Sequence, residues 1–260
     1  MLLNWNTHGN DLPPLRLTGL LAKLGETDSA ALRPYLERVE VTRGDRLFAV
    51  TDEGAFAYFS QGPLITIGQG RLVEVALVGN EGMVGWPVLV GCSYSPFEAT
   101  VCCRQGDILR IRTEHLRRLA AGSPALALLL SSFINAIGLQ MAETIGAAAS
   151  HRLEIRLARW ILLRHDRLNG DEVPVHHDDI AANLGTRRAS ITDTLHLLEG
   201  RGHVRGRRGR IIVRDRRGLE EIAGACFGAS ENFYRSVIGA FGKPLPQPVV
   251  APRLDLNAVP

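Results

Sequence analysis

The chain has 260 residues, of which 45% are hydrophobic and 22% are charged, and its formal net charge is +3. These values lie close to the averages of globular proteins, so they exclude a wholly disordered chain and a fibre, and the length fits one or two domains. The charge is unevenly spread, since residues 1–150 carry a net charge of −2, residues 151–217 of +6 and residues 218–260 of −1. This distribution predicts a polyanionic partner for the basic segment alone.

The N-terminal part of the chain predicts an arm followed by a compact β-domain. The first 25 or so residues show no clear pattern, and a short helix is expected around residues 28–35. Seven short β-type runs then follow, with glycines between or beside them at the expected turns. The candidate strands are 39–42, 46–50, 55–59, 64–67, 73–78, 100–103 and 108–111. Many short strands at this spacing favour a barrel or roll over a parallel α/β sheet.

The hydrophobic period changes at Ser123-Pro124, a suitable N-cap and first-turn pair for a long helix. Large apolar residues then recur at spacings of four and three, with small residues beside them. We expect this narrow seam to pair with the same helix of a second copy, whereas packing on the helix's own domain is the alternative. The seam residues are Leu130, Ile134, Ile137, Met141 and Ile145.

The same region raises the question of a membrane. Residues 119–142 contain no charged side chain and are long enough to span a bilayer. Pro124, Asn135 and Gln140 interrupt the stretch, and its apolar residues lie on one side. We therefore expect no membrane span. The first ten residues also lack the basic and apolar regions of a signal peptide.

A helix-turn-helix is predicted within the basic segment, after a helix over residues 152–169 and a small strand over 173–176. Helices are expected over residues 178–184 and 188–198, with Gly185 at the turn between them. Ala181, Gly185 and Ile191 have the spacing of this motif, in which a small residue lets the two helices cross closely. The start of the second helix turns polar and basic side chains outward, where they suit base edges and phosphates. These residues are Thr186, Arg187, Arg188, Ser190 and Thr192.

A β-hairpin over residues 204–213 follows, with its tip at residues 207–209. Its arginines Arg207, Arg208 and Arg210 suit a wing that lies along a phosphate backbone. The alternative is an ordinary helical hairpin with a solvated arginine face. Short helices over 219–227 and 232–241 and a proline-rich, disordered tail complete the expected organisation.

With these motifs together, the chain resembles the Crp/Fnr family of bacterial transcription regulators over about residues 20–225. The most specific stretches are EGMVGWPVLVG at 81–91, RLARWILLRHDR at 156–167, the helix-turn-helix at 178–199 and RRGRIIVRDRRGLE at 207–220. The resemblance implies an α+β fold: an N-terminal β-roll of the jelly-roll-like, cyclic-nucleotide-binding type, a long dimerisation helix and a C-terminal winged helix-turn-helix. It also implies a cytoplasmic homodimer that reads a two-fold-symmetric site on double-stranded DNA and contacts RNA polymerase.

The expected domains follow from this resemblance. They are an arm and β-roll sensor domain at 1–122, a dimerisation helix at 123–150, a winged helix-turn-helix domain at 151–227, and a short helix with the tail at 228–260.

The resemblance places an effector site at Gly82, Met83, Gly85, Phe97 and Glu98, where this sequence departs from the relatives that bind cyclic AMP. Those relatives have a glutamate after the glycine, which accepts the ribose hydroxyl, and an arginine that neutralises the phosphate. Here Met83 replaces the glutamate, while Phe97 and Glu98 stand where arginine and serine or threonine are expected. Because a carboxylate repels a phosphate, we expect no cyclic-nucleotide binding, and the effector stays unknown.

The cysteines and histidines predict no metal centre or cofactor. Cys92, Cys102, Cys103 and Cys226 form no CxxC pair, and residues 1–91 lack the cysteine cluster of the oxygen-sensing branch. Free thiols in a reducing compartment are expected, with burial favoured over a redox or metal site. His176-His177 is a candidate metal pair, but we favour a capping or phosphate-contacting role for both at the start of a helix.

Base recognition should differ from that of well-known family members, which use a glutamate and an arginine four residues apart. The matching positions are Ala189 and Asp193, which lack the required acceptor and donor. Arg188 is therefore the expected base reader. No phosphate loop, zinc signature or nucleophile elbow supports an enzyme. The alternative function is an effector-binding sensor whose winged helix binds protein and not DNA.

Overall fold

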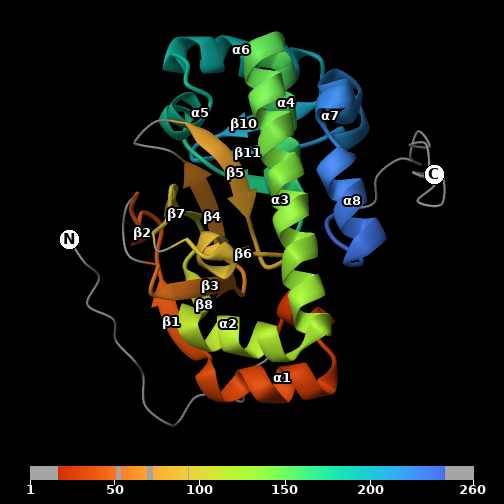
Figure 1. Cartoon of the computed structure of the whole chain (residues 1–260). Coiled ribbons are helices and arrows are strands. Elements are labelled where there is room, and N and C mark those ends of the chain that lie inside the picture. The colour runs from red at the N-terminus through yellow and green to blue at the C-terminus, as the bar shows by residue number, and fades with distance from the viewer. Residues whose placement is uncertain (1–16, 51–53, 69–72, 93, 244–260) are drawn as a thin grey trace, which may run out of the picture.

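A computed structural model describes residues 17–50, 54–68, 73–92 and 94–243 of the chain. The predictions for residues 1–16 and for the proline-rich segment 244–260 lie outside the described residues. Figure 1 shows a β-domain, a long helix running beside it, and a second group of helices and strands at the far end of that helix. The α+β fold class expected from the sequence is confirmed.

The N-terminal domain consists of two four-stranded antiparallel sheets. Their orders are β1-β8-β3-β6 and β2-β7-β4-β5, and a short helix, α1 (Glu26–Leu32), precedes them. The strands are β1 (Glu37–Val41), β2 (Arg46–Phe48), β3 (Phe56–Ser60), β4 (Leu64–Gly68), β5 (Glu74–Val78), β6 (Met83–Val84), β7 (Glu98–Cys103) and β8 (Gly106–Arg112). Strand β7 alternates half-buried and buried residues, which is the pattern of a strand with one face on the core.

The core of this domain lies between the sheets and extends to the long helix. Phe59, Ile65 and Ile108 are fully buried there. Helix α2 (Thr113–Gly122) covers one end of the roll, and α3 (Pro124–Ser150) begins directly after it. The N-cap predicted at Ser123 is confirmed, because its side chain accepts a hydrogen bond from the Leu126 N–H at 3.2 Å. Apolar residues of α3 complete the same core: Leu126, Leu130, Phe133, Ala136 and Ile137.

The C-terminal half folds around a second core. Its helices are α4 (Leu153–His165), α5 (His177–Asn183), α6 (Arg188–Gly200) and α7 (Arg216–Ala223), and its strands β9 (Glu172–Pro174), β10 (Val204–Arg207) and β11 (Arg210–Val213) form a sheet of order β10-β11-β9. Leu157, Ile191 and Leu219 are fully buried. This core also includes Leu64, Leu77 and Cys103 of the roll, so the two halves share apolar contacts.

Buried ion pairs join α4 to the roll. The guanidinium of Arg164 donates two hydrogen bonds to Glu74, at 3.0 and 2.6 Å, and stacks over the Trp160 ring. Arg167 donates to Glu81 at 2.7 Å, and both side chains are buried. Two arginines of the stretch 156–167 are therefore paired with carboxylates inside the protein. The charge available to an external partner is smaller than the net charge of segment 151–217 suggests.

A last helix, α8 (Ala229–Val237), packs along α3 beside the roll (Figure 1). The Tyr234 hydroxyl donates to the Glu81 carbonyl at 2.7 Å, and Ser230 donates to Glu143 of α3 at 2.6 Å. The Lys243 N–H donates to Asp166 just after α4 at 3.0 Å. The C-terminal segment thus contacts the roll, the long helix and the second domain at once.

The structure corrects several boundaries expected from the sequence. Strand β6 was not predicted, because its two residues are too few to show a periodic pattern. The helix expected over 152–169 ends at His165, and the two last helices begin three residues earlier than expected. For α7 the cause is the N-cap Asp215, whose carboxylate accepts from the Gly218 N–H at 2.9 Å.

Candidate nucleic-acid interface

Helices α5 and α6 form a helix-turn-helix at the positions predicted. Gly185 lies in the turn with φ of +59°, a conformation that favours glycine. The Thr186 N–H donates to the Ala181 carbonyl at 2.9 Å and closes the turn. Ala181 and Ile191 are buried between the helices, as the motif requires.

The first turns of α6 present polar side chains outward. Arg187, Arg188 and Ala189 are exposed, while Thr186, Ser190 and Thr192 are half-buried. Arg188 forms an ion pair with Asp178 of α5 at 3.1 Å, and both side chains are 66% exposed. This pair is weak in water, so Arg188 can exchange it for another acceptor. Asp193, one of the two positions that differ from the well-known relatives, is also exposed.

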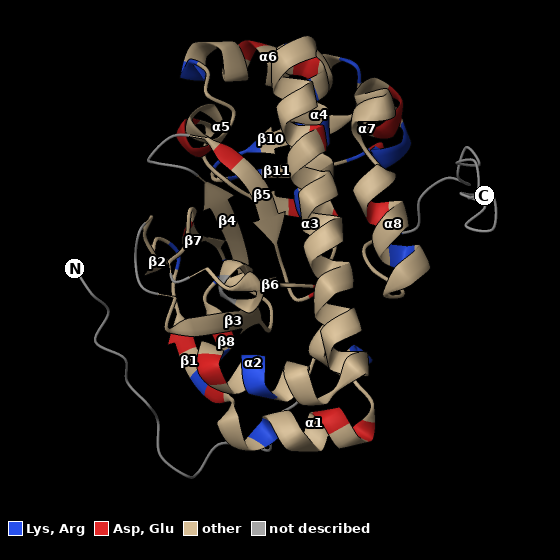
Figure 2. Ribbon diagram, in the orientation of Figure 1, with Lys and Arg blue, Asp and Glu red and all other residues tan. Residues whose placement is uncertain are grey.

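The wing follows α6 as predicted, with its turn at Arg208 and Gly209. Arg207, Arg208 and Arg210 are all exposed, and Arg210 makes a 3.5 Å ion pair with the equally exposed Glu172. Figure 2 shows that positive charge also gathers at the start of α6. Charged side chains of this kind on a hairpin suit the phosphate backbone of a duplex.

The histidine pair lies between the wing and α6. His176 is the N-cap residue of α5, and the preceding Val175 N–H donates to the Gly209 carbonyl at the wing tip at 2.9 Å. The His177 Nδ1 lies 3.1 Å from the Thr192 hydroxyl. The residues proposed to bind DNA on α5, α6 and the wing are therefore neighbours. No group of three or more histidine, cysteine or acidic residues in the described ranges could hold a metal ion.

One residue of this surface was not found from the sequence. Arg43, in the turn between β1 and β2, forms a 2.5 Å ion pair with Asp179 of α5. Val73, just before β5, makes a β-bridge with Leu184, the C-cap residue of α5. No local motif marks Arg43, because only the tertiary fold brings it to α5.

The protein's own side chains occupy the space beside the predicted effector residues. Phe133 of α3 packs so closely on Gly82 that an added Cβ would lie 2.3 Å from its ring. Met83 is fully buried, and Gly85 lies against the Phe56 carbonyl with φ of +90°. Phe97 packs against Trp86, with ring centroids 5.9 Å apart, and Glu98 begins β7.

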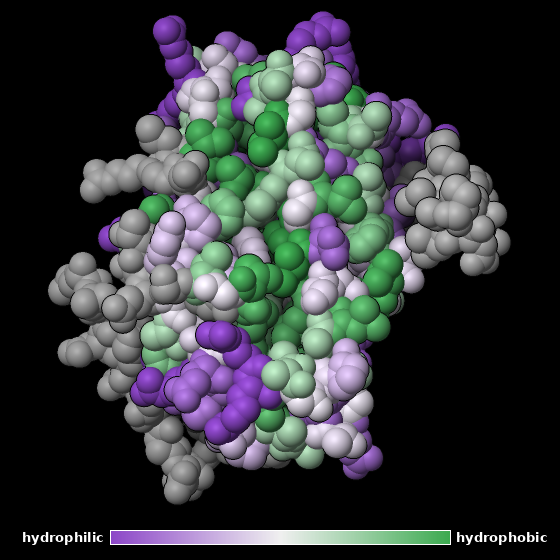
Figure 3. All heavy atoms as spheres, viewed as in Figure 1, coloured by the Kyte–Doolittle hydropathy of each residue, from purple (hydrophilic) through white to green (hydrophobic). Residues whose placement is uncertain are grey.

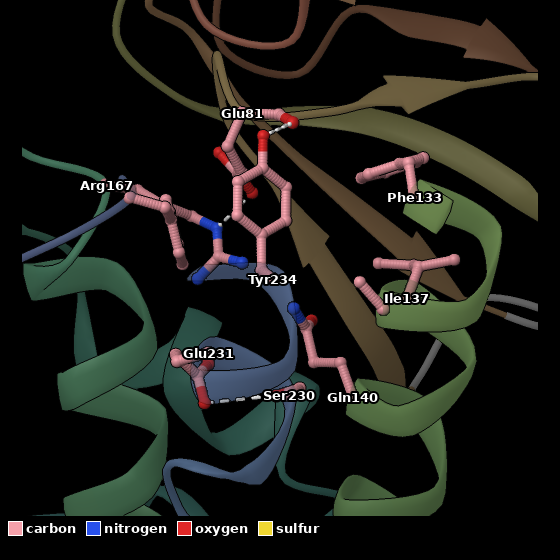
Figure 4. A pocket seen from close by; sticks show the side chains of 10 residues that line it. Glu81, Phe133, Ile137, Gln140, Arg167, Ser230, Glu231 and Tyr234 are labelled. Atoms are coloured by element: carbon pink, nitrogen blue, oxygen red, sulfur yellow. Dashed lines mark hydrogen bonds and ion pairs between the residues drawn. The ribbon is translucent and has the colours of Figure 1, made fainter. Parts of the chain in front are cut away.

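The neighbouring cavity is too small for a nucleotide. Figure 4 shows it between the roll, α3 and α8, with the Tyr234 hydroxyl bonded to Glu81 at one side. Its volume is about 20 Å³, which is room for a single water molecule. Arg167 lines it, but its guanidinium is already paired with Glu81.

The cysteines are consistent with a structural role. Burial raises the pKa of Cys102 to about 12 and also raises the pKa values of Cys103 and Cys226. Thiols with raised pKa values stay protonated and react slowly. Cys92 is exposed, and all four cysteines are free.

The predicted dimer seam needs a correction. Leu130 and Ile137 are 3% exposed and belong to the core of their own domain, so they are not available to a partner. Ile134 and Met141 are half-buried at the flank, and Ile145 is 61% exposed. The reason is that the roll buries one face of the helix, and the exposed residues form a different heptad pattern on the other face. Its members are Leu128, Ser131, Asn135, Gly138, Ala142 and Ile145.

This exposed face of α3 is uncharged. Figure 2 shows the helix nearly free of charge, and green or white spheres follow much of it in Figure 3. A Cβ added at Gly138 would meet nothing within 4 Å, so the surface is open there. Helix α3 is also the one helix in the described ranges that is long and apolar enough to span a membrane. Its burial against the roll and α8 accounts for part of that apolarity, since 39% of the apolar stretch is buried.

Comparison with known proteins agrees with this architecture. Residues 155–222 match the family model of the Crp-like helix-turn-helix domain. A putative transcriptional regulator of the Crp/Fnr family from Eubacterium rectale is 17% identical, with a TM-score of 0.61 over 78% of this chain and 97% of that one. A CRP-family regulator from Thermus thermophilus is 19% identical, with a TM-score of 0.61 over 73% and 98%.

FixK2 from Bradyrhizobium japonicum is 14% identical, also with a TM-score of 0.61 over 73% and 98%. No curated protein matches the sequence. The chain therefore contains a Crp-like helix-turn-helix domain and has the overall fold of Crp/Fnr transcription regulators.

Proposed function

We propose that this protein is a homodimeric, sequence-specific DNA-binding transcription regulator of the Crp/Fnr type. The observation that carries the proposal is the surface formed by α6 and the wing. Four arginines there are exposed: Arg187 and Arg188 at the start of α6, and Arg207 and Arg208 on the wing. Arginines on such a helix read guanine, and those on the wing hold phosphate.

In this proposal the domains are the β-roll sensor at 1–122, the dimerisation helix at 123–150 and the winged helix-turn-helix at 151–227. The exposed heptad of α3 pairs with the same face of a second copy. An uncharged helix face with small residues suits close helix–helix approach. The protein acts in the cytoplasm, contacts RNA polymerase and has no enzymatic activity.

We further propose that cyclic nucleotides do not regulate it. Phe133 occupies the space over Gly82, and Met83 offers no acceptor for a ribose hydroxyl. The half-buried Glu98 would repel a cyclic phosphate.

The test is a gel-shift experiment with the full chain and fragments of its own genome, followed by crosslinking and enrichment of promoters. Specific retardation of a few fragments supports DNA reading. Absence of any retardation at low salt would favour the other function, in which the winged helix binds a protein.

A further inference from the structure

The side chain of Arg43 links the sensor domain to the proposed DNA-binding surface. Arg43 lies in the turn between β1 and β2, and its Nη2 is 2.5 Å from the Asp179 carboxylate of α5. The same carboxylate oxygen accepts the His176 N–H at 3.1 Å. Val175, the residue before His176, donates its N–H to the Gly209 carbonyl at the wing tip at 2.9 Å. Arg43, His176 and the wing therefore lie in an unbroken series of contacts.

The Arg43 guanidinium is free to bind more than Asp179. Its side chain is 47% exposed. A guanidinium has five N–H donors in a planar fork, which suits phosphate oxygens, and the pair with Asp179 engages the Nη2 end. Arg104, in the turn between β7 and β8, is also exposed.

The local charge gives Arg43 a second role. Asp178 and Asp179 place two carboxylates beside the residues proposed to bind DNA. Arg188 pairs with Asp178, and Arg43 pairs with Asp179. Without Arg43, the Asp179 carboxylate would repel a nearby phosphate.

The Arg43–Asp179 pair is not needed to hold the two domains together. Half-exposed ion pairs contribute little to stability. The roll and α4 are already joined by the buried pair Glu74–Arg164 and by a shared apolar core.

We propose that the DNA-binding surface extends onto the sensor domain, where Arg43 neutralises Asp179 and contacts the phosphate backbone of the duplex. This inference rests on the proposed DNA-binding function. It means that the roll contributes directly to DNA affinity, without sequence preference, in addition to positioning the winged helix.

The experiment measures binding of the full chain to a selected site and to an unrelated duplex by fluorescence anisotropy, over a range of salt concentrations. Arg43→Ala should weaken binding to both duplexes by a similar factor of about three to ten and lower the salt slope by roughly one. Arg112→Ala is the matched control, because Arg112 is exposed at the opposite end of the same roll, where β8 meets α2, and it should bind like the wild type. Circular dichroism and the melting temperature check that each variant folds.

A second variant separates the two roles of Arg43. Arg43→Ala combined with Asp179→Asn removes the repulsive carboxylate but does not restore the phosphate contact. The double variant should therefore still bind more weakly than the wild type. Full recovery in this double variant would overturn the phosphate contact. Unchanged or tighter binding by folded Arg43→Ala would overturn the whole inference. If the wild type itself binds no duplex, the proposed function fails, which is a different result.

Discussion

Arg188 and Arg208 differ in what they are expected to read. Arg188 lies in the first turn of α6 and Arg208 at the wing turn, and both are exposed. Arg188→Ala should cost about 1–3 kcal/mol on the cognate site and relax the preference at one base pair. Arg208→Ala should weaken binding to all duplexes similarly and lower the salt slope by roughly one. Anisotropy titrations on single-base site variants measure both. Normal binding of the cognate site by Arg188→Ala would exclude it as a base reader.

The buried pair Glu74–Arg164 makes a second prediction at the scale of single residues. Both side chains are about 5% exposed or less, so Glu74→Ala leaves a buried, unpaired guanidinium. We expect the free energy of unfolding to fall by about 3–5 kcal/mol. Glu221→Ala breaks the exposed pair with Arg217 and should change it by less than about 1 kcal/mol. Urea denaturation compares the two variants. Equal losses of stability would contradict the claim that the buried Glu74–Arg164 pair joins α4 to the roll.

The sequence predicted the helices and the hairpin that carry the proposed interface residues, because these elements follow local rules. The spacing of Ala181, Gly185 and Ile191 places α5 and α6, and the turn glycine at Gly209 places the wing. Arg43 and the pair Glu74–Arg164 were not predicted, because the two partners of each ion pair lie far apart in the chain. Arg43 pairs with Asp179 of α5, and Glu74 of β5 pairs with Arg164 of α4. Local patterns carry no information on such pairs.

Helix α3 illustrates the limit of periodicity at the scale of an element. The pattern of four and three identified a long helix that begins after Ser123, and the structure has it there. The pattern did not tell which face is turned to the roll, because both faces of the helix are apolar. The pattern therefore assigns Leu130 and Ile137 to the partner, although they are buried in the core of the roll.

This phase makes a prediction that separates the two faces. Ile145→Glu places a charge on the exposed face, where it should disrupt the proposed dimer and leave the protomer folded. Ile137→Glu places the charge in the core and should unfold the chain, since an unpaired buried charge costs several kcal/mol. Light scattering at micromolar concentration and circular dichroism distinguish the variants. A dimeric Ile145→Glu protein would show that another surface holds the two copies together.

At the scale of the whole molecule, the roll, α3 and α8 surround a space next to Gly82, where the sequence places part of the effector site. Here Phe133 and Tyr234 close it, and a cavity of about 20 Å³ is left. Calorimetry with millimolar cyclic AMP or cyclic GMP should therefore show no saturable heat, with 5′-AMP as the control. Saturable binding of either cyclic nucleotide, but not of the control, would mean that α3 or α8 moves aside.

The central claim is that two copies of this chain read a two-fold-symmetric DNA sequence. The most direct test is selection of binding sites by the full chain from a pool of random duplexes. The account predicts enrichment of an inverted repeat whose half-sites are about one helical turn apart, roughly 10–10.5 base pairs. It also predicts a half-site that differs from the usual one of the family, because Ala189 and Asp193 lack the required groups. Failure to enrich any inverted repeat would contradict the claim.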